Sequence, residues 1–144
     1  MPPPLIREAI NSMSNPSDIR EISFSVEERF MSTPQARPNR YGQWRIPSDH
    51  PVHEQQKRIR EAARAAGAMP VANVAIEVRY VIHGTIVGNP RSATMTILDA
   101  LEGVAFKERD QVCRLSSSRE PENEGQPPFF SVVIKCLERP FDTL

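Results

Sequence analysis

The sequence predicts a small α/β or α+β domain, built from a mixed four-stranded sheet with two main helices on one side. Its 144 residues are enough for one domain with one hydrophobic core. Strand patterns occur at residues 22–26, 74–82, 112–116 and 129–137, and helix signals at 51–66 and 90–102. The order strand, long loop, helix, strand, helix, strand, strand indicates this fold class.

The strands are predicted from alternation of apolar and other residues. The segment from Ile22 to Val26 alternates strictly, and is expected to be a half-buried strand. The longest such segment has an apolar residue at every second position, which places one face in the core: Val74, Ile76, Val78, Tyr80 and Ile82. Residues 116–128 are polar, and we expect a mobile loop or a hairpin tip there.

The helices are predicted from their end signals. Pro51 stands in the first turn of one helix, where its missing N–H costs nothing, and Gly67 ends it. Asn89 is expected to cap the next helix, with Pro90 as its first residue and Gly103 after its end. The buried stripe of this second helix is expected to contain Thr94, Ile97, Leu98 and Leu101.

The chain is expected to consist of one domain over residues 21–140, preceded by an appendage over residues 1–20. In the appendage, apolar residues share one helical face: Leu5, Ile6, Ala9, Ile10 and Met13. One short helix is not stable in isolation, so it must dock on the body or on a partner. Residues 32–51 are expected to form a long loop, which in a compact domain is either functional or disordered.

Composition bounds the possible functions. The formal net charge is zero, so a nucleic-acid site would have to be a local basic patch. Cys113 and Cys136 are expected to be small buried hydrophobes in a reducing compartment. We find no signal peptide, no apolar run of membrane length and no Gly-rich phosphate loop. We therefore expect a cytoplasmic protein with no membrane association and no small-molecule substrate.

One local basic patch is present within residues 37–64. It combines an arginine-containing loop with the exposed face of the helix at 51–66, and Tyr41 and Trp44 lie among its basic residues. Basic and aromatic side chains together suit a phosphate backbone and unstacked bases. The alternative is a solvated helix face and a loop whose aromatic residues pack on the body. The candidate DNA-binding residues here are Arg37, Arg40, Arg45, Lys57 and Arg58.

Three elements, in order, resemble the RusA-type Holliday-junction resolvases, small homodimeric phage and prophage endonucleases. The first is the alternating strand at 22–26, followed by a basic loop with Arg37-Pro38-x-Arg40. The second is a basic helix that leads through Met69-Pro70 into a long strand. The third and most specific is the segment 97–112, which is similar to the family's Leu-Asp-Ala-Leu-Asn-Gly-Val, aromatic, Asp-Asp, one residue, Gln-Val. The resemblance covers roughly residues 21–137.

The resemblance implies an active site whose acidic residues have been replaced in this chain. The family's Asp-x-Asp-Asn at the helix start falls on Asn89 to Ser92, so that an arginine, Arg91, stands at an acidic position. The family's helix lysine falls on Met95, and its paired aspartates fall on Glu108 and Arg109. The family uses these carboxylates to hold Mg²⁺ beside the scissile phosphate. Arginine at two of these positions opposes binding of a cation.

The sequence leaves three functions open. We expect first a catalytically degenerate, homodimeric RusA-like protein that binds branched DNA without a metal cofactor, with Arg91 added to the basic residues of the loop and helix. The second is an interaction module that binds a host protein, for which the N-terminal helix and the acidic loop at 120–124 are the motivating features. The third is a Mg²⁺-dependent endonuclease with a rebuilt site. Its candidate metal ligands are Glu108, Asp110 and Asp99.

Overall fold

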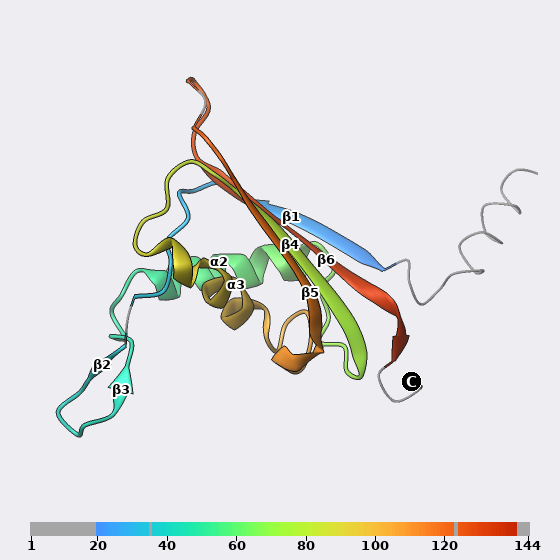
Figure 1. The fold of residues 1–144 in the computed structure, drawn as a ribbon, viewed down its shortest axis with the longest axis horizontal. Coiled ribbons are helices and arrows are strands. Elements are labelled where there is room, and N and C mark those ends of the chain that lie inside the picture. Colours follow the sequence, from blue (N-terminus) through green and yellow to red (C-terminus); the bar gives the residue numbers. More distant parts are fainter. Residues whose placement is uncertain (1–19, 35, 123, 141–144) are drawn as a thin grey trace, which may run out of the picture.

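The computed structural model, which describes residues 20–34, 36–122 and 124–140, is a two-layer α+β domain. A four-stranded sheet forms one layer, and two helices cover one of its faces (Figure 1). A small two-stranded hairpin projects from the body at the side where the first helix begins. The predicted fold class, a mixed four-stranded sheet with two helices, is therefore confirmed.

The regular elements have the following bounds. The strands are β1 (Glu21–Val26), β2 (Arg37–Pro38), β3 (Trp44–Arg45), β4 (Val74–His83), β5 (Val112–Glu120) and β6 (Phe129–Pro140). The helices are α2 (Val52–Ala65) and α3 (Ala93–Leu101), with short 3₁₀ turns η1 (Pro90–Ser92) and η2 (Arg109–Gln111).

The strand order in the main sheet is β1-β6-β4-β5. The strand β6 pairs antiparallel with both β1 and β4, while β4 pairs parallel with β5. The parallel pair requires a crossover, and η1 and α3 supply it between β4 and β5. The sheet is mixed because the helical connection brings β5 back parallel to β4, whereas the loop after β5 reverses the chain and makes β6 antiparallel to β4.

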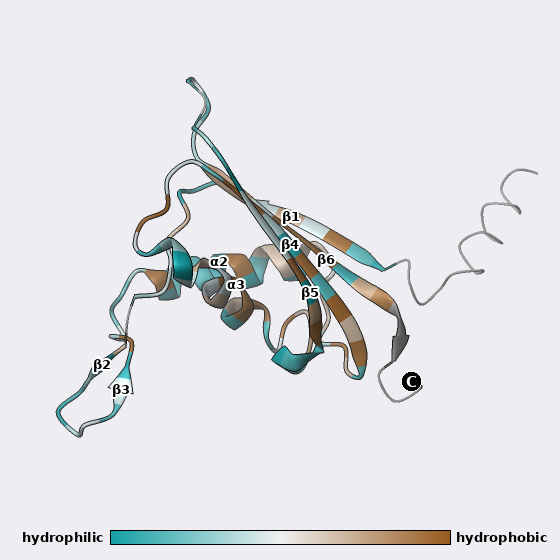
Figure 2. Cartoon of the chain, in the orientation of Figure 1, coloured by the Kyte–Doolittle hydropathy of each residue, from teal (hydrophilic) through white to brown (hydrophobic). Residues whose placement is uncertain are grey.

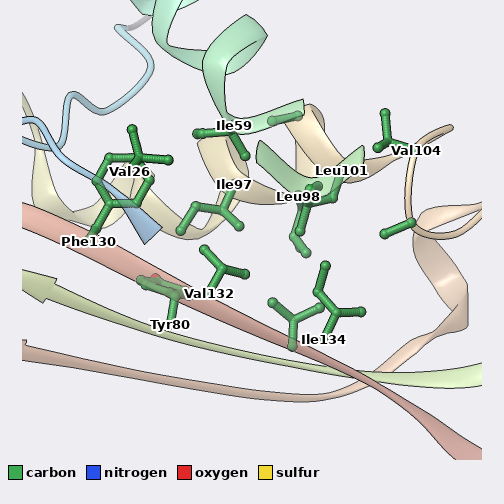
Figure 3. Close-up of a cluster of buried hydrophobic side chains, with 14 of the residues drawn as sticks. Val26, Ile59, Tyr80, Ile97, Leu98, Leu101, Val104, Phe130, Val132 and Ile134 are labelled. Carbon is green, nitrogen blue, oxygen red and sulfur yellow. The ribbon is translucent and has the colours of Figure 1, made fainter. Parts of the chain in front are cut away.

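The core lies between the sheet and the two helices. Alternate residues of β4 and β6 point toward the helices, and Figure 3 shows Val132 and Ile134 of β6 below Ile97 and Leu101 of α3. The hydropathy colouring in Figure 2 follows the same alternation along the strands. The largest side chains that are fully buried here are Phe30, Phe106 and Phe130. Each buried aromatic side chain of this kind contributes about 1.5–3 kcal/mol.

The helix end signals act as predicted. The Asn89 side chain accepts a hydrogen bond of 3.0 Å from the Arg91 backbone N–H, as an N-cap does. Gly103, with a φ of +83°, follows the last residues of α3. The predicted stripe of α3 was wrong at one position, because Thr96 is fully buried and Thr94 is half-buried with a hydrogen bond to the Tyr80 hydroxyl.

Three further expectations are corrected. The strand β5 continues through Ser116–Glu120, where a loop was predicted, because these residues pair with β4 in spite of their polar sequence. The segment 32–51 is not one irregular loop, because it contains the β2–β3 hairpin. Cys113 is exposed instead of buried, since it lies at a register irregularity of the edge strand β5, whereas Cys136 is buried as predicted.

The predicted N-terminal helix lies within residues 1–19, outside the described residues. Among the residues that the structure describes, no helix has both the length and the apolar character needed to cross a membrane.

Candidate functional site

The β2–β3 hairpin owes its shape to two turn residues. The Asn39 side-chain oxygen accepts hydrogen bonds from the backbone N–H groups of Tyr41 and Gln43, at 2.8 and 3.0 Å. The backbone N–H of Asn39 donates to the carbonyl of Gln43, which closes the hairpin. Gly42 adopts a φ of +76°, which favours glycine. The loop tip is therefore set by local hydrogen bonds and not by a hydrophobic core.

The hairpin presents cationic and aromatic side chains to solvent. Arg37 and Arg45 are direct cross-strand partners, so their side chains project from the same face of the ribbon. Like charges in such a pair destabilise the hairpin in isolation. Trp44 is 66% exposed and Tyr41 is 72% exposed, which excludes packing of these aromatic rings on the body. The ribbon therefore has a basic face with Arg37 and Arg45, and Trp44 projects uncovered from its other face.

Tyr41 and Arg40 at the tip form a pair of their own. The Arg40 guanidinium lies 5.0 Å from the centre of the Tyr41 ring and donates a hydrogen bond of 2.9 Å to its hydroxyl. Within the described part of the chain, no ion pair involves Arg37, Arg40 or Arg45.

Buried polar side chains fix the segment that leads into the hairpin. The amide of Gln55 in α2 accepts from the Met31 N–H at 2.9 Å and donates to the Arg29 carbonyl at 2.8 Å. The hydroxyl of Thr96 in α3 accepts from the Thr33 N–H at 2.6 Å. These bonds tie residues 29–33 to both helices. The chain is consequently fixed to both helices shortly before the hairpin begins, although the tip of the hairpin has no core.

The two predicted cations of α2 differ in their surroundings. Lys57 is exposed, and no ion pair with another described residue occupies it. Arg58 instead donates two hydrogen bonds to the Glu28 carboxylate, at 2.6 and 2.9 Å. The bond to Glu28 raises the pKa of Arg58 above its ordinary value. Of these two residues, Lys57 is the one available to a ligand without loss of an existing interaction.

His50 and His53 at the start of α2 both bond to backbone groups nearby. The His50 ring accepts a hydrogen bond from the Val52 N–H at 3.1 Å, and the His53 ring lies 2.9 Å from the Pro47 carbonyl. These contacts fix the connection between the hairpin and α2.

Three exposed side chains of η1 and α3 lie along one face. Arg91, Met95 and Asp99 follow one another at intervals of one helical turn. Arg109, in the turn η2 before β5, reaches this face, and its guanidinium pairs with Asp99 and, at 3.2 Å, with Glu102. A terminal guanidinium nitrogen also lies 3.7 Å from the Met95 sulfur. The structure thus brings three side chains, those of Met95, Asp99 and Glu102, together around one arginine.

The other two candidate metal ligands, Glu108 and Asp110, lie at the start of the turn η2 and within it. Gln111, which is 5% exposed, accepts from the N–H groups of Lys107 and Glu108 and donates to the carbonyls of Val71 and Val74. Beside it is a hollow of about 320 Å³, lined by Ala72, Asn73, Lys107, Glu108, Asp110 and Gln111. Glu108 and Asp110 therefore border a polar hollow, while Asp99 is bound to Arg109.

These residues do not fit a Mg²⁺ site of the family type. The Asn89 side-chain oxygen already serves as a helix cap, and the Asp99 carboxylate already binds a cationic side chain. Mg²⁺ requires hard oxygen ligands around it, including one or two carboxylates. Arg109 presents a fixed positive charge to the two carboxylates of α3 that could have supplied them.

Sequence reasoning missed both the Arg109 cluster and the anchor of the hairpin. The spacing of Asp99 and Glu102 on one helix was a signal that these acids share a face. Nothing in the sequence places Arg109 beside them, because that contact depends on the path that the chain takes from α3 to β5. The turn at Asn39 and Gly42 did have a recognisable pattern, since both residues are common in tight turns.

The chain matches no protein-family model and no curated protein.

We predict that replacing Glu28 with Gln removes part of the pH dependence of stability. Burial raises the pKa of Glu28, but hydrogen bonds from Arg58 and Gln55 and the charge of Arg58 outweigh it, so the pKa lies below its ordinary 4.5. A lowered folded-state pKa adds stability above the unfolded value, and this stability is lost as the pH falls through the folded value. E28Q should therefore cost roughly 0.2–1 kcal/mol at neutral pH.

The measurement is urea unfolding of both proteins between neutral and strongly acid pH. The difference between wild type and E28Q should shrink toward zero as the pH falls below the folded-state pKa. Glu21→Gln, at an exposed position of β1, should show no such trend. A difference that stays constant across the range would contradict the assignment of the lowered pKa to Glu28.

We also predict that Arg109→Ala makes stability sensitive to divalent cations. The variant leaves the carboxylates of Asp99 and Glu102 on one helix face without a positive partner. We expect a loss of roughly 0.2–1 kcal/mol, part of which Mg²⁺ or Mn²⁺ restores by binding there. Thermal unfolding with EDTA or with metal measures this, and Arg64→Ala on exposed α2 is the matched control. Equal effects of metal on variant, control and wild type would show that Arg109 does not occupy a cation position.

Proposed function

We propose that this chain is a RusA-like, catalytically degenerate protein that binds branched or structured DNA without cutting it. The single observation that carries the proposal is the exposed β2–β3 hairpin, which presents Arg37 and Arg45 on one face and an uncovered Trp44 on the other. Phosphate groups would relieve the repulsion between the two arginines. The tryptophan and Tyr41 offer flat faces on which unpaired bases can stack.

The position of the hairpin supports this use. The chain is fixed to α2 and α3 shortly before the hairpin begins, and the tip of the hairpin projects away from the body (Figure 1). A projection anchored in this way can enter the space between the arms of a branched duplex. Lys57 on α2 and Arg91 in η1 are exposed, and would add phosphate contacts on the body. Arg58 would contribute only if its bonds to Glu28 were given up.

The Arg109 cluster supports the absence of cleavage. Hydrolysis of a phosphodiester by this family depends on a metal ion that activates water and neutralises the leaving oxygen. At one of the positions that the resemblance aligns with the family's acids stands Arg109, which binds Asp99 and Glu102. DNA binding by arginine and aromatic side chains needs no metal, so loss of the acids would remove the chemistry and leave binding. We propose that the protein acts in the cytoplasm as a homodimer, as the family resemblance implies.

The first test compares a four-way junction with linear duplex DNA of the same sequence, in EDTA and in Mg²⁺. We expect preferential binding to the junction in both buffers, with no nicked product. Trp44 is the single tryptophan of the chain, so quenching of its fluorescence should accompany binding. Cleavage in Mg²⁺ would favour the alternative of a rebuilt nuclease. A lack of DNA binding would favour a protein-interaction module.

The second test uses the salt dependence of that binding. Arg37→Gln and Arg45→Gln should each weaken junction binding, and each should reduce the slope of log K against log [salt] by about 0.7–0.9. Arg64→Gln makes the same charge change at an exposed position near the far end of α2, and should leave the slope as it is. Equal slopes for all three variants would contradict a phosphate-binding role for the hairpin.

A further inference from the structure

The edge strand β5 is exposed over most of its length. Within the described residues it pairs only with β4, so its outer edge has no partner strand. Every residue from Cys113 to Glu120 is exposed, which means that neither face of this stretch is covered. The opposite edge strand β1 differs, because it packs against α2 and has Val26 in the core. A long uncovered edge is a template for pairing with another strand.

The direction of the free main-chain groups of β5 follows from one hydrogen bond. The Glu120 carbonyl accepts from the Gly84 N–H at 2.9 Å, so the main chain of Glu120 faces the β4 side. Main-chain groups alternate in direction along a strand. Those of Leu115, Ser117 and Arg119 consequently face outward, where no other described strand lies. This segment contains no proline that would block pairing.

We propose that two copies of this chain pair antiparallel through β5, with the two-fold axis at Ser117. In that register each Arg114 lies opposite Glu120 of the other copy, and the symmetry makes this pair twice. Both residues lie on the open face of the sheet, beside Glu77 and His83 of β4. No described residue forms an ion pair with Arg114 or Glu120 within the chain. Opposite charges placed directly across a ladder stabilise it.

Apolar surface on the helix side of β5 adds to this contact. Leu115 is 46% exposed there, and the register places it opposite Arg119 of the second copy, whose aliphatic stem can cover it. Next to it lies a hollow of about 310 Å³, which includes Tyr80, Ile82 and Ile86 in its lining. In the proposed dimer, the strand β5 of the second copy would lie along the edge of this hollow. Pairing would join the two sheets into one continuous sheet of eight strands.

The inference names a surface for a homodimer and draws on the geometry of β5. It gives a surface to the homodimer of the proposed function and rests on that part of it, but its test contains no DNA, so the dimer surface and the binding of DNA can fail separately. A strand from another protein could occupy the same edge. The two-fold charge pattern of Arg114 and Glu120 favours a second copy, because an unrelated strand would match it only by chance.

The experiment is a charge exchange followed by sedimentation velocity at several concentrations. The wild-type chain should dimerise. Arg114→Glu places two acids opposite each other, and Glu120→Arg places two bases opposite each other, so each variant alone should dimerise roughly tenfold or more weakly. An equimolar mixture of the two variants makes every cross-strand pair opposite in charge, and should recover association to near the wild-type level.

The mixture also controls for misfolding, since two misfolded variants would not restore a dimer to each other. Circular dichroism of each variant should match that of the wild type. A wild-type chain that stays monomeric at all concentrations would overturn the proposal. So would a mixture that associates no better than its components, or a dimer that neither variant weakens.

Discussion

The constraint on which the rest of this structure depends is that, within the described residues, helices cover one face of the sheet and leave the other face open. Most of the hydrophobic core is made by side chains of the sheet and of the helices α2 and α3, so one apolar layer has to hold the described fold together (Figure 3). Residues beyond the reach of the two helices are half-buried at most, as on the open face of β4 and β6. Two parts of the chain are in this position, the β2–β3 hairpin and the far part of β5. Both are ordered by hydrogen bonds, and both leave side chains available to partners. The candidate functional surfaces are thus those that the core cannot cover.

Polar side chains compensate where the apolar layer ends. Gln55 and Thr96 bind backbone groups of residues 29–33, and Gln111 binds four backbone groups of the segments that flank η2. A buried amide of this kind is costly unless its donors and acceptors are all used, and Gln111 does use them. Such residues set the position of a loop more narrowly than apolar contacts do, because hydrogen bonds are directional. The attachment of the chain just before the hairpin is therefore a consequence of where the two helices place their few buried polar groups.

The sequence was sufficient for the parts of the fold whose signal is periodic. The strand β4 and the helix α2 lie within one residue of their predicted bounds and α3 within three, since alternation and capping are local properties. It was not sufficient for Ser116–Glu120, whose strand conformation comes from pairing with β4 and not from an apolar pattern. The candidate site, too, could be predicted from the sequence only in part. The basic residues near Arg37 and Arg45 could be named in advance, but their cross-strand pairing could not. The contact of Arg109 with Asp99 depends on tertiary structure alone.

A net charge of zero does not exclude a basic surface, because the charges are not evenly neutralised. The ion pairs of the described chain engage Arg29 with Glu122, Arg58 with Glu28, and Arg109 with Asp99 and Glu102. In these pairs the opposite charges largely cancel, so the paired residues add little to the electrostatic potential at the surface. Residues 37–45 contain three arginines and no acidic residue. At physiological salt, charges more than about 8 Å away are screened, so a ligand at the hairpin meets mainly the local arginines. The balanced total therefore conceals a local positive potential on a projection that carries the only tryptophan of the chain.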